Sequence, residues 1–332
     1  MEYFLNIIYF VLILLITIIS KAGIIILLSA GSRWRCDYTY VRKANGYFKF
    51  HEIPANWYDA RMRCQLEGAV LASPYPQEVQ DAFRRLMAHR QKNNTIFIGI
   101  HATFSKGDYY TINGTPLSKI PIKWMESEPD NKDNAESCLI FTPNGLAADT
   151  KCEDTHPYFC YKEKKEDDLF MDYCGTSDHA YEYNEQTHSC YKFHTVPHKW
   201  SGAHMACSAE GGHLVIINSK EEAEYIKKLY AKNPDNKMIG TFRKDLVFIG
   251  VRDWNEHADW RTIHGETLKE AGYDTFGPGE PNNWTTGQYC GGAFKTALLA
   301  DLLCEEHFPF ICEKKPNSLV CDEEECTVFD AE

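Results

Sequence analysis

The sequence repeats itself, and this duplication limits the fold more than any other feature. Three cysteines of the first half are spaced 14 and 8 residues apart, and three of the second half repeat both spacings 152 residues later (Cys138, Cys152 and Cys160; Cys290, Cys304 and Cys312). Glu128-Pro129 and Glu280-Pro281 share that offset. A chain of 332 residues is long enough for two domains of ordinary size. We therefore expect two tandem domains of one fold.

Two upstream motifs recur at shorter offsets. A tryptophan and a cysteine recur after 143 residues, and a Phe-Ile-Gly motif recurs after 151 residues (Trp57 and Cys64 with Trp200 and Cys207; 97–100 with 248–251). The second offset exceeds the first by 8 residues, so the second copy contains an insertion between these two motifs, within residues 227–245. That segment is polar and contains Pro and Gly, which predicts a surface loop.

Each copy predicts the same order of secondary structure. An alternating aromatic run, GYFKFH or CYKFH, indicates a strand. In the helix that follows, Trp57, Ala60 and Cys64 fall at i, i+3 and i+7, so the cysteine is expected on the buried face. A second helix comes next, and in the second copy Ser219 and Glu222 predict a capping box at its start. The Phe-Ile-Gly strand and a long loop rich in Gly, Pro, Asn and Asp complete an α+β domain.

Residues 1–31 are predicted to be a secretory signal peptide. Residues 3–20 carry no charge, and small residues at 29–31 predict a cleavage site there, with a cut after Ala22 as the alternative. The alternative is a transmembrane anchor, because 18 uncharged residues are just long enough to cross a bilayer. Only Glu2 precedes the run and Lys21 follows it, which opposes the positive-inside bias. We therefore expect a secreted, extracellular protein without a stable membrane span.

Export fits the cysteine content and the glycosylation sequons. Thirteen cysteines in an exported chain predict structural disulfides. Asn93, Asn113 and Asn283 each open an Asn-x-Ser/Thr sequon, so we expect N-glycosylation there.

Charge and motifs exclude two classes of function. The net charge of −12 argues against nucleic acid as a partner, because that partner needs a basic face, and it is compatible with cation binding. The histidines are scattered, and none stands in a Ser/His/Asp, Cys/His or HExxH context (His51, His101, His156, His194, His198 and His213 are examples). We expect a binding protein and not an enzyme.

Taken together, these motifs resemble the C-type lectin-like domain family, twice. The resemblance rests on the Trp-x6-Cys helix, the Phe-Ile-Gly strand, the Glu-Pro-Asn/Asp tripeptide and the final Cys-x7-Cys. It covers residues 36–163 and 174–314, followed by an acidic tail at 315–332. It implies two helices, small antiparallel sheets and a long disulfide-clamped loop in each domain. The two-domain secreted arrangement resembles the immulectins of insect haemolymph, which are pattern-recognition lectins.

The resemblance implies five disulfides. Two tie the first helix of each domain to its last strand, two clamp the binding loops, and one closes an N-terminal hairpin of the second domain (Cys64–Cys160 and Cys207–Cys312; Cys138–Cys152 and Cys290–Cys304; Cys174–Cys190). The first domain has Tyr47 where the second has Cys190, so Cys36 lacks its domain partner. Either Cys321 and Cys326 pair with each other and Cys36 links a homodimer, or one of them bonds Cys36.

In this family one Ca²⁺ in the long loop bridges protein and sugar, since calcium accepts up to eight oxygens from mixed donors. Carried onto the first domain, the expected metal ligands are Glu128, Asp130, Glu136 and Asp149. In the second domain they are Glu280, Asn282, Gln288 and Asp301, with a cis bond expected before Pro281. Both domains lack the family's Asn ligand, which Ala148 and Ala300 replace.

The two sets differ in charge and in hydrogen bonding. Four carboxylates predict tighter Ca²⁺ binding in the first domain. The sugar contacts are expected from Glu280, Asn282, Gln288 and Asp301, and from Glu128 and Asp130. An acceptor beside an amide donor, as in Glu280 with Asn282, fits mannose- or glucose-type hydroxyls, whereas Glu128 with Asp130 offers acceptors only.

Two functions follow from the resemblance. The first is a Ca²⁺-dependent pattern-recognition lectin that binds mannose- or glucose-type sugars or bacterial polysaccharide, and promotes agglutination and innate immune responses. The alternative is a Ca²⁺-independent, protein-binding module of the same fold. Sensitivity to a chelator distinguishes them.

Overall fold

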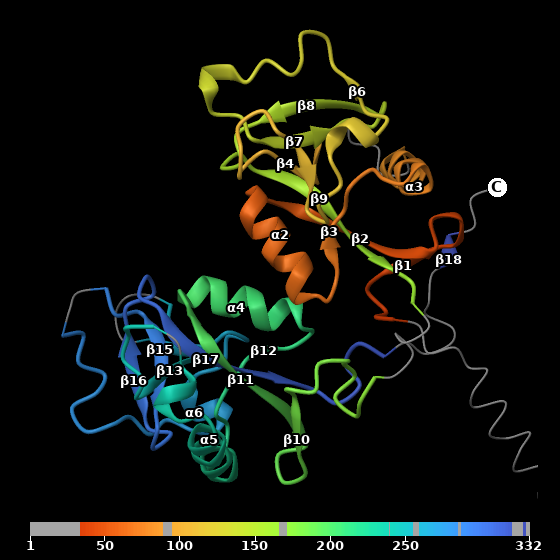
Figure 1. The fold of residues 1–332 in the computed structure, drawn as a ribbon. Coiled ribbons are helices and arrows are strands. Elements are labelled where there is room, and N and C mark those ends of the chain that lie inside the picture. Colours follow the sequence, from red (N-terminus) through yellow and green to blue (C-terminus); the bar gives the residue numbers. More distant parts are fainter. Residues whose placement is uncertain are drawn as a thin grey trace, which may run out of the picture.

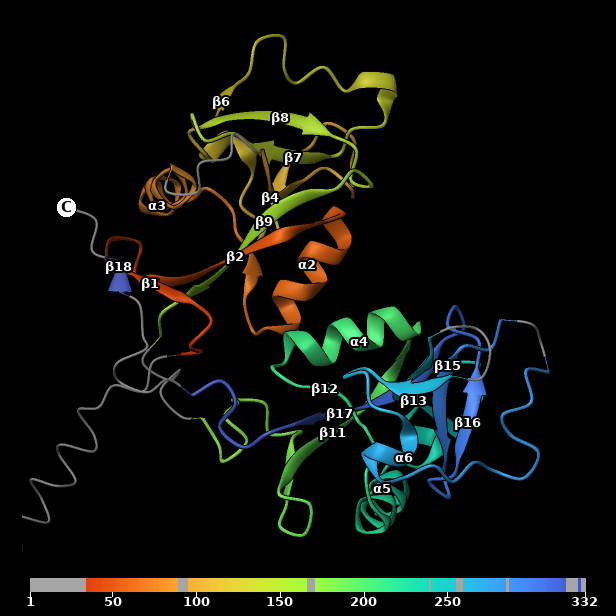
Figure 2. The same cartoon turned by 180° about the vertical axis from the view of Figure 1, so that it is seen from behind.

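The computed structural model describes residues 34–88, 95–165, 171–238, 240–254, 259–284 and 287–320, and the backbone of 328–329. The predicted signal peptide, Asn93, Cys321 and Cys326 lie outside the described residues. Figure 1 shows two similar domains, the first from red to yellow-green and the second from green to blue, and Figure 2 shows them from behind.

The first domain follows the predicted order of strand, helix, helix, strand and long loop. Its α-helices and strands are β1 (Thr39–Val41), β2 (Gly46–Ala55), α2 (Trp57–Leu66), β3 (Val70–Leu71), α3 (Gln77–Ala88), β4 (Ile96–His101), β5 (Tyr110–Thr111), β6 (Lys123–Trp124), β7 (Cys138–Phe141), β8 (Leu146–Thr150) and β9 (His156–Glu163). Short 3-10 helices at Arg42–Ala44, Leu117–Lys119 and Lys132–Asn134 complete it.

The second domain repeats that order. It contains β10 (Glu182–Asn184), β11 (Ser189–His198), α4 (Trp200–Ala209), β12 (His213–Leu214), α5 (Lys220–Lys232), β13 (Leu246–Asp253), β14 (Trp260–Thr262), α6 (Leu268–Ala271), β15 (Cys290–Phe294), β16 (Leu299–Leu302) and β17 (Phe308–Lys314). A 3-10 helix, η5 (Asp235–Lys237), lies in the predicted insertion. The last strand of the chain, β18 (Val328–Phe329), joins the first domain.

The sheets are mixed and not purely antiparallel. The first runs β18-β1-β2-β9-β4-β7-β8-β6, with parallel pairs at β1–β18, β4–β9 and β6–β8. The second runs β10-β11-β17-β13-β15-β16, with a parallel pair at β13–β17. The predicted fold class, two α+β domains with few helices, is confirmed.

The first helix of each domain is fixed to the Phe-Ile-Gly strand. Asn56 caps α2 by accepting the Asp59 N–H. The Trp57 indole donates to the Ile98 carbonyl at 2.9 Å, and Trp200 donates to Ile249 at 3.0 Å. The motif needs glycine because a Cβ on Gly99 would lie 2.2 Å from the Leu71 carbonyl oxygen.

The five disulfides that the resemblance implies are all formed. Their Cα atoms lie between 5.1 and 5.8 Å apart, inside the usual range for this bond (Cys64–Cys160, Cys138–Cys152, Cys174–Cys190, Cys207–Cys312 and Cys290–Cys304). Cys64 and Cys207 lie on the buried faces of α2 and α4, as their helical spacing predicts.

The capping box predicted for α5 is only half formed. Ser219 accepts the Glu222 N–H at 3.2 Å, but the Glu222 carboxylate accepts the Asn218 N–H instead of the Ser219 N–H. The reason is that Glu222 is fully buried, where the Tyr191 hydroxyl donates to its other oxygen at 2.5 Å.

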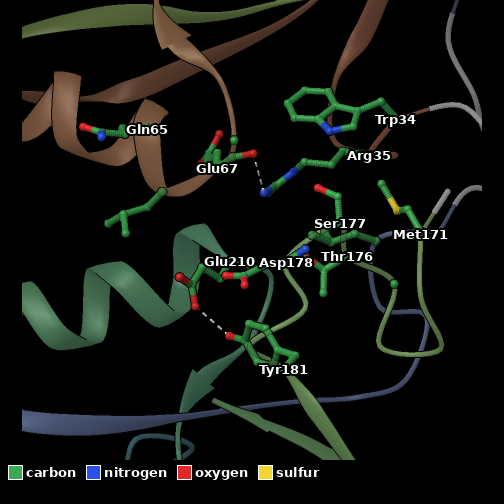
Figure 3. A pocket seen from close by; sticks show the side chains of 14 residues that line it. Trp34, Arg35, Gln65, Glu67, Met171, Thr176, Ser177, Asp178, Tyr181 and Glu210 are labelled. Atoms are coloured by element: carbon green, nitrogen blue, oxygen red, sulfur yellow. Dashed lines mark hydrogen bonds between the residues drawn. The ribbon is translucent and has the colours of Figure 1, made fainter. Parts of the chain in front are cut away.

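The two domains meet where α2 packs against α4. Arg35 is 5% exposed and donates to the carbonyl of Glu67 at 3.2 Å and, across the boundary, to that of Ala209 at 2.8 Å. Figure 3 shows Arg35 reaching toward Glu67 at the edge of a cavity of about 160 Å³ between the domains. One guanidinium therefore binds the C-terminal ends of both helices.

The C-terminal segment returns to the first domain. The Cys36 N–H donates to the Leu319 carbonyl at 3.2 Å, and the Ser318 hydroxyl donates to the Gly211 carbonyl at 3.0 Å. The backbone of β18 then pairs with β1. Part of the predicted acidic tail is thus an edge strand of the first sheet.

No helix in the described part of the chain is long and apolar enough to cross a membrane.

Candidate functional site

The long loop of each domain is organised around one buried aspartate. Asp149 on β8 accepts the N–H groups of Asp130 and Asn131 at 3.1 and 3.0 Å. Asp301 on β16 accepts those of Asn282 and Asn283 at 2.9 and 2.7 Å. The aspartates hold the residues after Pro129 and Pro281, and both of these prolines follow a cis bond.

A second pair of residues, not predicted as metal or sugar ligands, shapes the same loops. Asn131 and Asn283 have left-handed backbones, with φ of 44° and 43°. The side chain of Asn131 accepts the Glu136 N–H at 3.2 Å, and that of Asn283 accepts the Gln288 N–H at 3.4 Å. Their shared place two residues after the proline was the available signal, since asparagine tolerates this conformation.

Three of the four predicted ligands of the first domain converge. Oxygen atoms of Glu128, Asp130 and Asp149 all lie within 4.8 Å of one another. Glu136 stands beside this group, where its carboxylate accepts the Lys132 N–H at 2.8 Å; the same N–H reaches Asp130 at 3.0 Å. Tyr109 closes the inner side by donating to Asp149 at 3.3 Å.

The electrostatics of this group favour a cation. Burial, the hydrogen bond with Asp149 and the charge of Asp130 raise the pKa of Glu128 to about 7. Burial first, and then the neighbouring acids, also raise the pKa of Glu136. The Oε2 atom of Glu128 is buried and has no hydrogen-bond partner among the described residues. A divalent cation would neutralise the clustered charge and satisfy that oxygen, so the first domain's residues fit Ca²⁺.

The second domain's site has fewer oxygens to offer. Glu280 accepts the side-chain N–H of Asn282 at 2.8 Å, and Gln288 donates to the Asp301 backbone carbonyl at 3.2 Å. Burial, followed by the hydrogen bond and charge of Asp301, raises the pKa of Glu280 to about 7. The four predicted residues therefore lie together. They do not form a cluster of acids: Glu280 pairs with the amide of Asn282, and Asp301 holds the backbone of the loop.

Neither domain has a side-chain ligand at the position of the missing Asn. Ala148 and Ala300 are 5% and 2% exposed, and both lie within strands that pair with β7 or β15. Each carries only a methyl group, so neither donates a metal ligand. Trp284, in contrast, is 90% exposed next to Asn283 and presents an apolar face beside the polar loop.

The sequons differ in setting. Asn113 is exposed in the turn after β5, and Asn283 is exposed on the candidate site itself. Glycosylation at either position stays a prediction.

Two other clusters with metal-ligand chemistry are structural. His51 and His194 bond Glu67 and Glu210 at 3.3 and 3.0 Å, close to a cysteine in each case. Both cysteines are in disulfides, Cys64–Cys160 and Cys207–Cys312, so neither supplies a thiolate ligand. The pairs instead repeat one buried acid-base contact in each domain.

The family model of the lectin C-type domain matches residues 53–162 and 196–314, which together make up more than half of the chain. The chain belongs to the C-type lectin family. Both matches lie inside the predicted domains, and each contains one of the two loops.

The relatives of this C-type lectin family member match it over different lengths. The hemolymph lipopolysaccharide-binding protein of Periplaneta americana is 36% identical over 37% of this chain, and the match spans 48% of that relative's length. The C-type lectin lectoxin-Lio2 of Erythrolamprus poecilogyrus is 33% identical over 39% of this chain and 76% of its own. The human secretory phospholipase A2 receptor is 22% identical over 88% of this chain but only 20% of its own length.

Among solved structures, the carbohydrate-recognition domain of the mouse scavenger receptor C-type lectin aligns with 42% of this chain and 99% of its own. The identity is 27% and the TM-score is 0.35.

Proposed function

We propose that this C-type lectin family member is a secreted pattern-recognition lectin that binds microbial surface carbohydrate with the help of Ca²⁺. The observation that carries the proposal is the first domain's cluster of Glu128, Asp130 and Asp149, with one buried carboxylate oxygen that lacks a partner among the described residues. The name of the Periplaneta relative, a lipopolysaccharide-binding protein, supports a microbial polysaccharide as ligand.

In this proposal the two domains differ in their affinity for calcium and in the sugars that they prefer. The first holds Ca²⁺ more tightly because its ligands are carboxylates, and charge count tunes calcium affinity. The second favours mannose- or glucose-type hydroxyls because Glu280 accepts and Asn282 donates. Without the Asn ligand each site is weak, and two domains on one chain raise the overall affinity and allow agglutination.

One observation favours the alternative for the second domain. Glu280 already accepts the Asn282 side-chain N–H, and only two of the four predicted ligands are carboxylates, so this loop offers fewer charged oxygens to a metal than the loop of the first domain. A loop that binds a protein without calcium is expected to offer few charged oxygens to a metal.

The test is retention of the full-length protein on mannan and on a bacterial polysaccharide, first with Ca²⁺ and then with a chelator. We expect retention with Ca²⁺, release by the chelator, and loss in Glu128→Gln or Glu280→Gln. Glu126→Gln removes the same charge from an exposed position two residues before Glu128, and it should bind normally. Binding that persists in chelator, or no binding to either glycan, would overturn the calcium-dependent mechanism.

A further inference from the structure

The insertion that distinguishes the second domain builds a cavity of its own. A hollow of about 550 Å³ lies between the C-terminal end of α5 and the loop that contains η5. Its polar lining includes Lys227, Asn233, Asp235, Asn236 and Lys295. Most of these residues lie in or next to the predicted insertion, so the first domain has no sequence counterpart of this loop.

The segment around the cavity is basic although the protein is acidic. Between Lys227 and Lys244 there are six basic side chains and one acidic side chain, whereas the whole chain carries a net charge of −12. Lys227, Lys232 and Arg243 are paired with acids outside this segment (Glu224, Glu182 and Asp245), and the remaining excess of basic side chains favours anions at this place on the surface.

The two lysines that line the cavity each form one ion pair through the ammonium group and stay partly exposed. Lys295 lies 2.6 Å from Asp235, and Lys227 lies 2.6 Å from Glu224, while their side chains stay 45% and 39% exposed. Lys244 fixes the loop by donating to the carbonyls of Asp235 and Met238 at 2.9 and 2.7 Å. An ammonium group has three donors, so one ion pair leaves each lysine able to bind a ligand.

The end of β15 comes close to the candidate sugar loop, because a Cβ on Gly277 would lie 2.9 Å from the Phe294 ring and 3.6 Å from the Glu280 side chain. Lys295 follows directly after β15, the strand that pairs with β16 and faces Asp301 across the register. The Lys295 N–H also donates to the Asp245 carbonyl at 3.1 Å, which ties it to the end of the insertion. A long polysaccharide that reached the loop of the second domain could therefore extend to the basic segment.

We propose that this cavity is a metal-independent subsite for a phosphate group carried by a saccharide. Lysine ammonium groups bind phosphate as point charges, and a phosphate group carries more negative charge than a single carboxylate. The inference rests on the proposed function, since it takes the ligand to be a polysaccharide, but it requires no calcium.

The experiment measures binding of the full-length protein to immobilised lipopolysaccharide in chelator, beside the same material after chemical removal of its phosphate groups. The phosphorylated form should bind, and the Lys227→Gln and Lys295→Gln changes should each weaken it about tenfold. Lys228→Gln is the matched control, because Lys228 is an exposed neighbour on α5 outside the cavity lining, and it should leave binding unchanged.

A further variant separates the site from a merely structural role. Asp235→Asn frees Lys295 from its ion pair and should strengthen phosphate binding about threefold, since an exposed pair of this kind contributes little. Weaker binding in this variant, equal binding after dephosphorylation, or equally tight binding to a phosphate-free uronic-acid polysaccharide would overturn the assignment. Calcium-dependent retention on mannan should be unchanged in the lysine variants, so failure of this site and failure of the proposed function are distinguishable.

Discussion

Replacing Arg35 with alanine should uncouple the two domains. The guanidinium is buried, forms a two-pronged bond to Asp37 at 3.0 and 2.9 Å, and donates to a helix-end carbonyl in each domain. A hydrogen bond to a charged group contributes about 1.5–3 kcal/mol. The bond to Ala209 is the one that crosses the boundary, so the free energy of coupling should fall by about that amount, and the first domain should lose about 3–5 kcal/mol in total.

Differential scanning calorimetry measures both quantities. For a domain of this size 1 kcal/mol corresponds to roughly 3 °C in the unfolding midpoint, so the first domain's transition should move down by about 10 °C and separate from the second. Lys43→Ala, which removes an exposed positive charge from the same domain, is the control and should leave the thermogram unchanged. A midpoint shift of less than about 3 °C in Arg35→Ala would refute the argument that this side chain joins the domains.

Three further predictions concern stability and covalent structure. Burial first, and then the charge of Glu313, raise the pKa of Glu222 to about 7, above its unfolded value of 4.5. The contribution of Glu222 to the free energy of unfolding is therefore complete below pH 4.5 and is lost as the pH rises through 7. Glu222→Gln should therefore raise the free energy of unfolding by about 1–3 kcal/mol at pH 8 and little at pH 4.5 in denaturant titrations, and an equal gain at both pH values would contradict this. The Cys36 sulfur lies 3.4 Å from the Leu319 carbonyl, two residues before Cys321 in sequence, so non-reducing peptide mapping should find Cys36 bonded to Cys321 within one chain; a reducible dimer on a non-reducing gel would instead support the intermolecular bond. Gly99→Ala should destabilise the first domain by about 1–3 kcal/mol in the same titrations, because its Cβ would overlap the Leu71 carbonyl, and unchanged stability would show that the strand can shift.

The sequence by itself determined the features that are written in local spacing. The duplicated cysteine pattern and the helical spacing of Trp57, Ala60 and Cys64 predicted two domains with the first helix buried against its sheet, because periodicity and repeat offsets need no knowledge of distant contacts. The family resemblance supplied the disulfide pairs and the Glu-Pro loops. Both loops were found with Asp149 or Asp301 behind them.

Only the tertiary structure decided how the two copies differ and how they are joined. Arg35 meets Ala209 across 174 residues of sequence, and β18 pairs with β1 from the opposite end of the chain. Glu222 was predicted to complete a capping box, yet it is buried against Tyr191. These contacts depend on which distant segments the folded chain brings together. The free energy of burying a charged group is set by the residues packed around it in the fold and not by its neighbours in sequence.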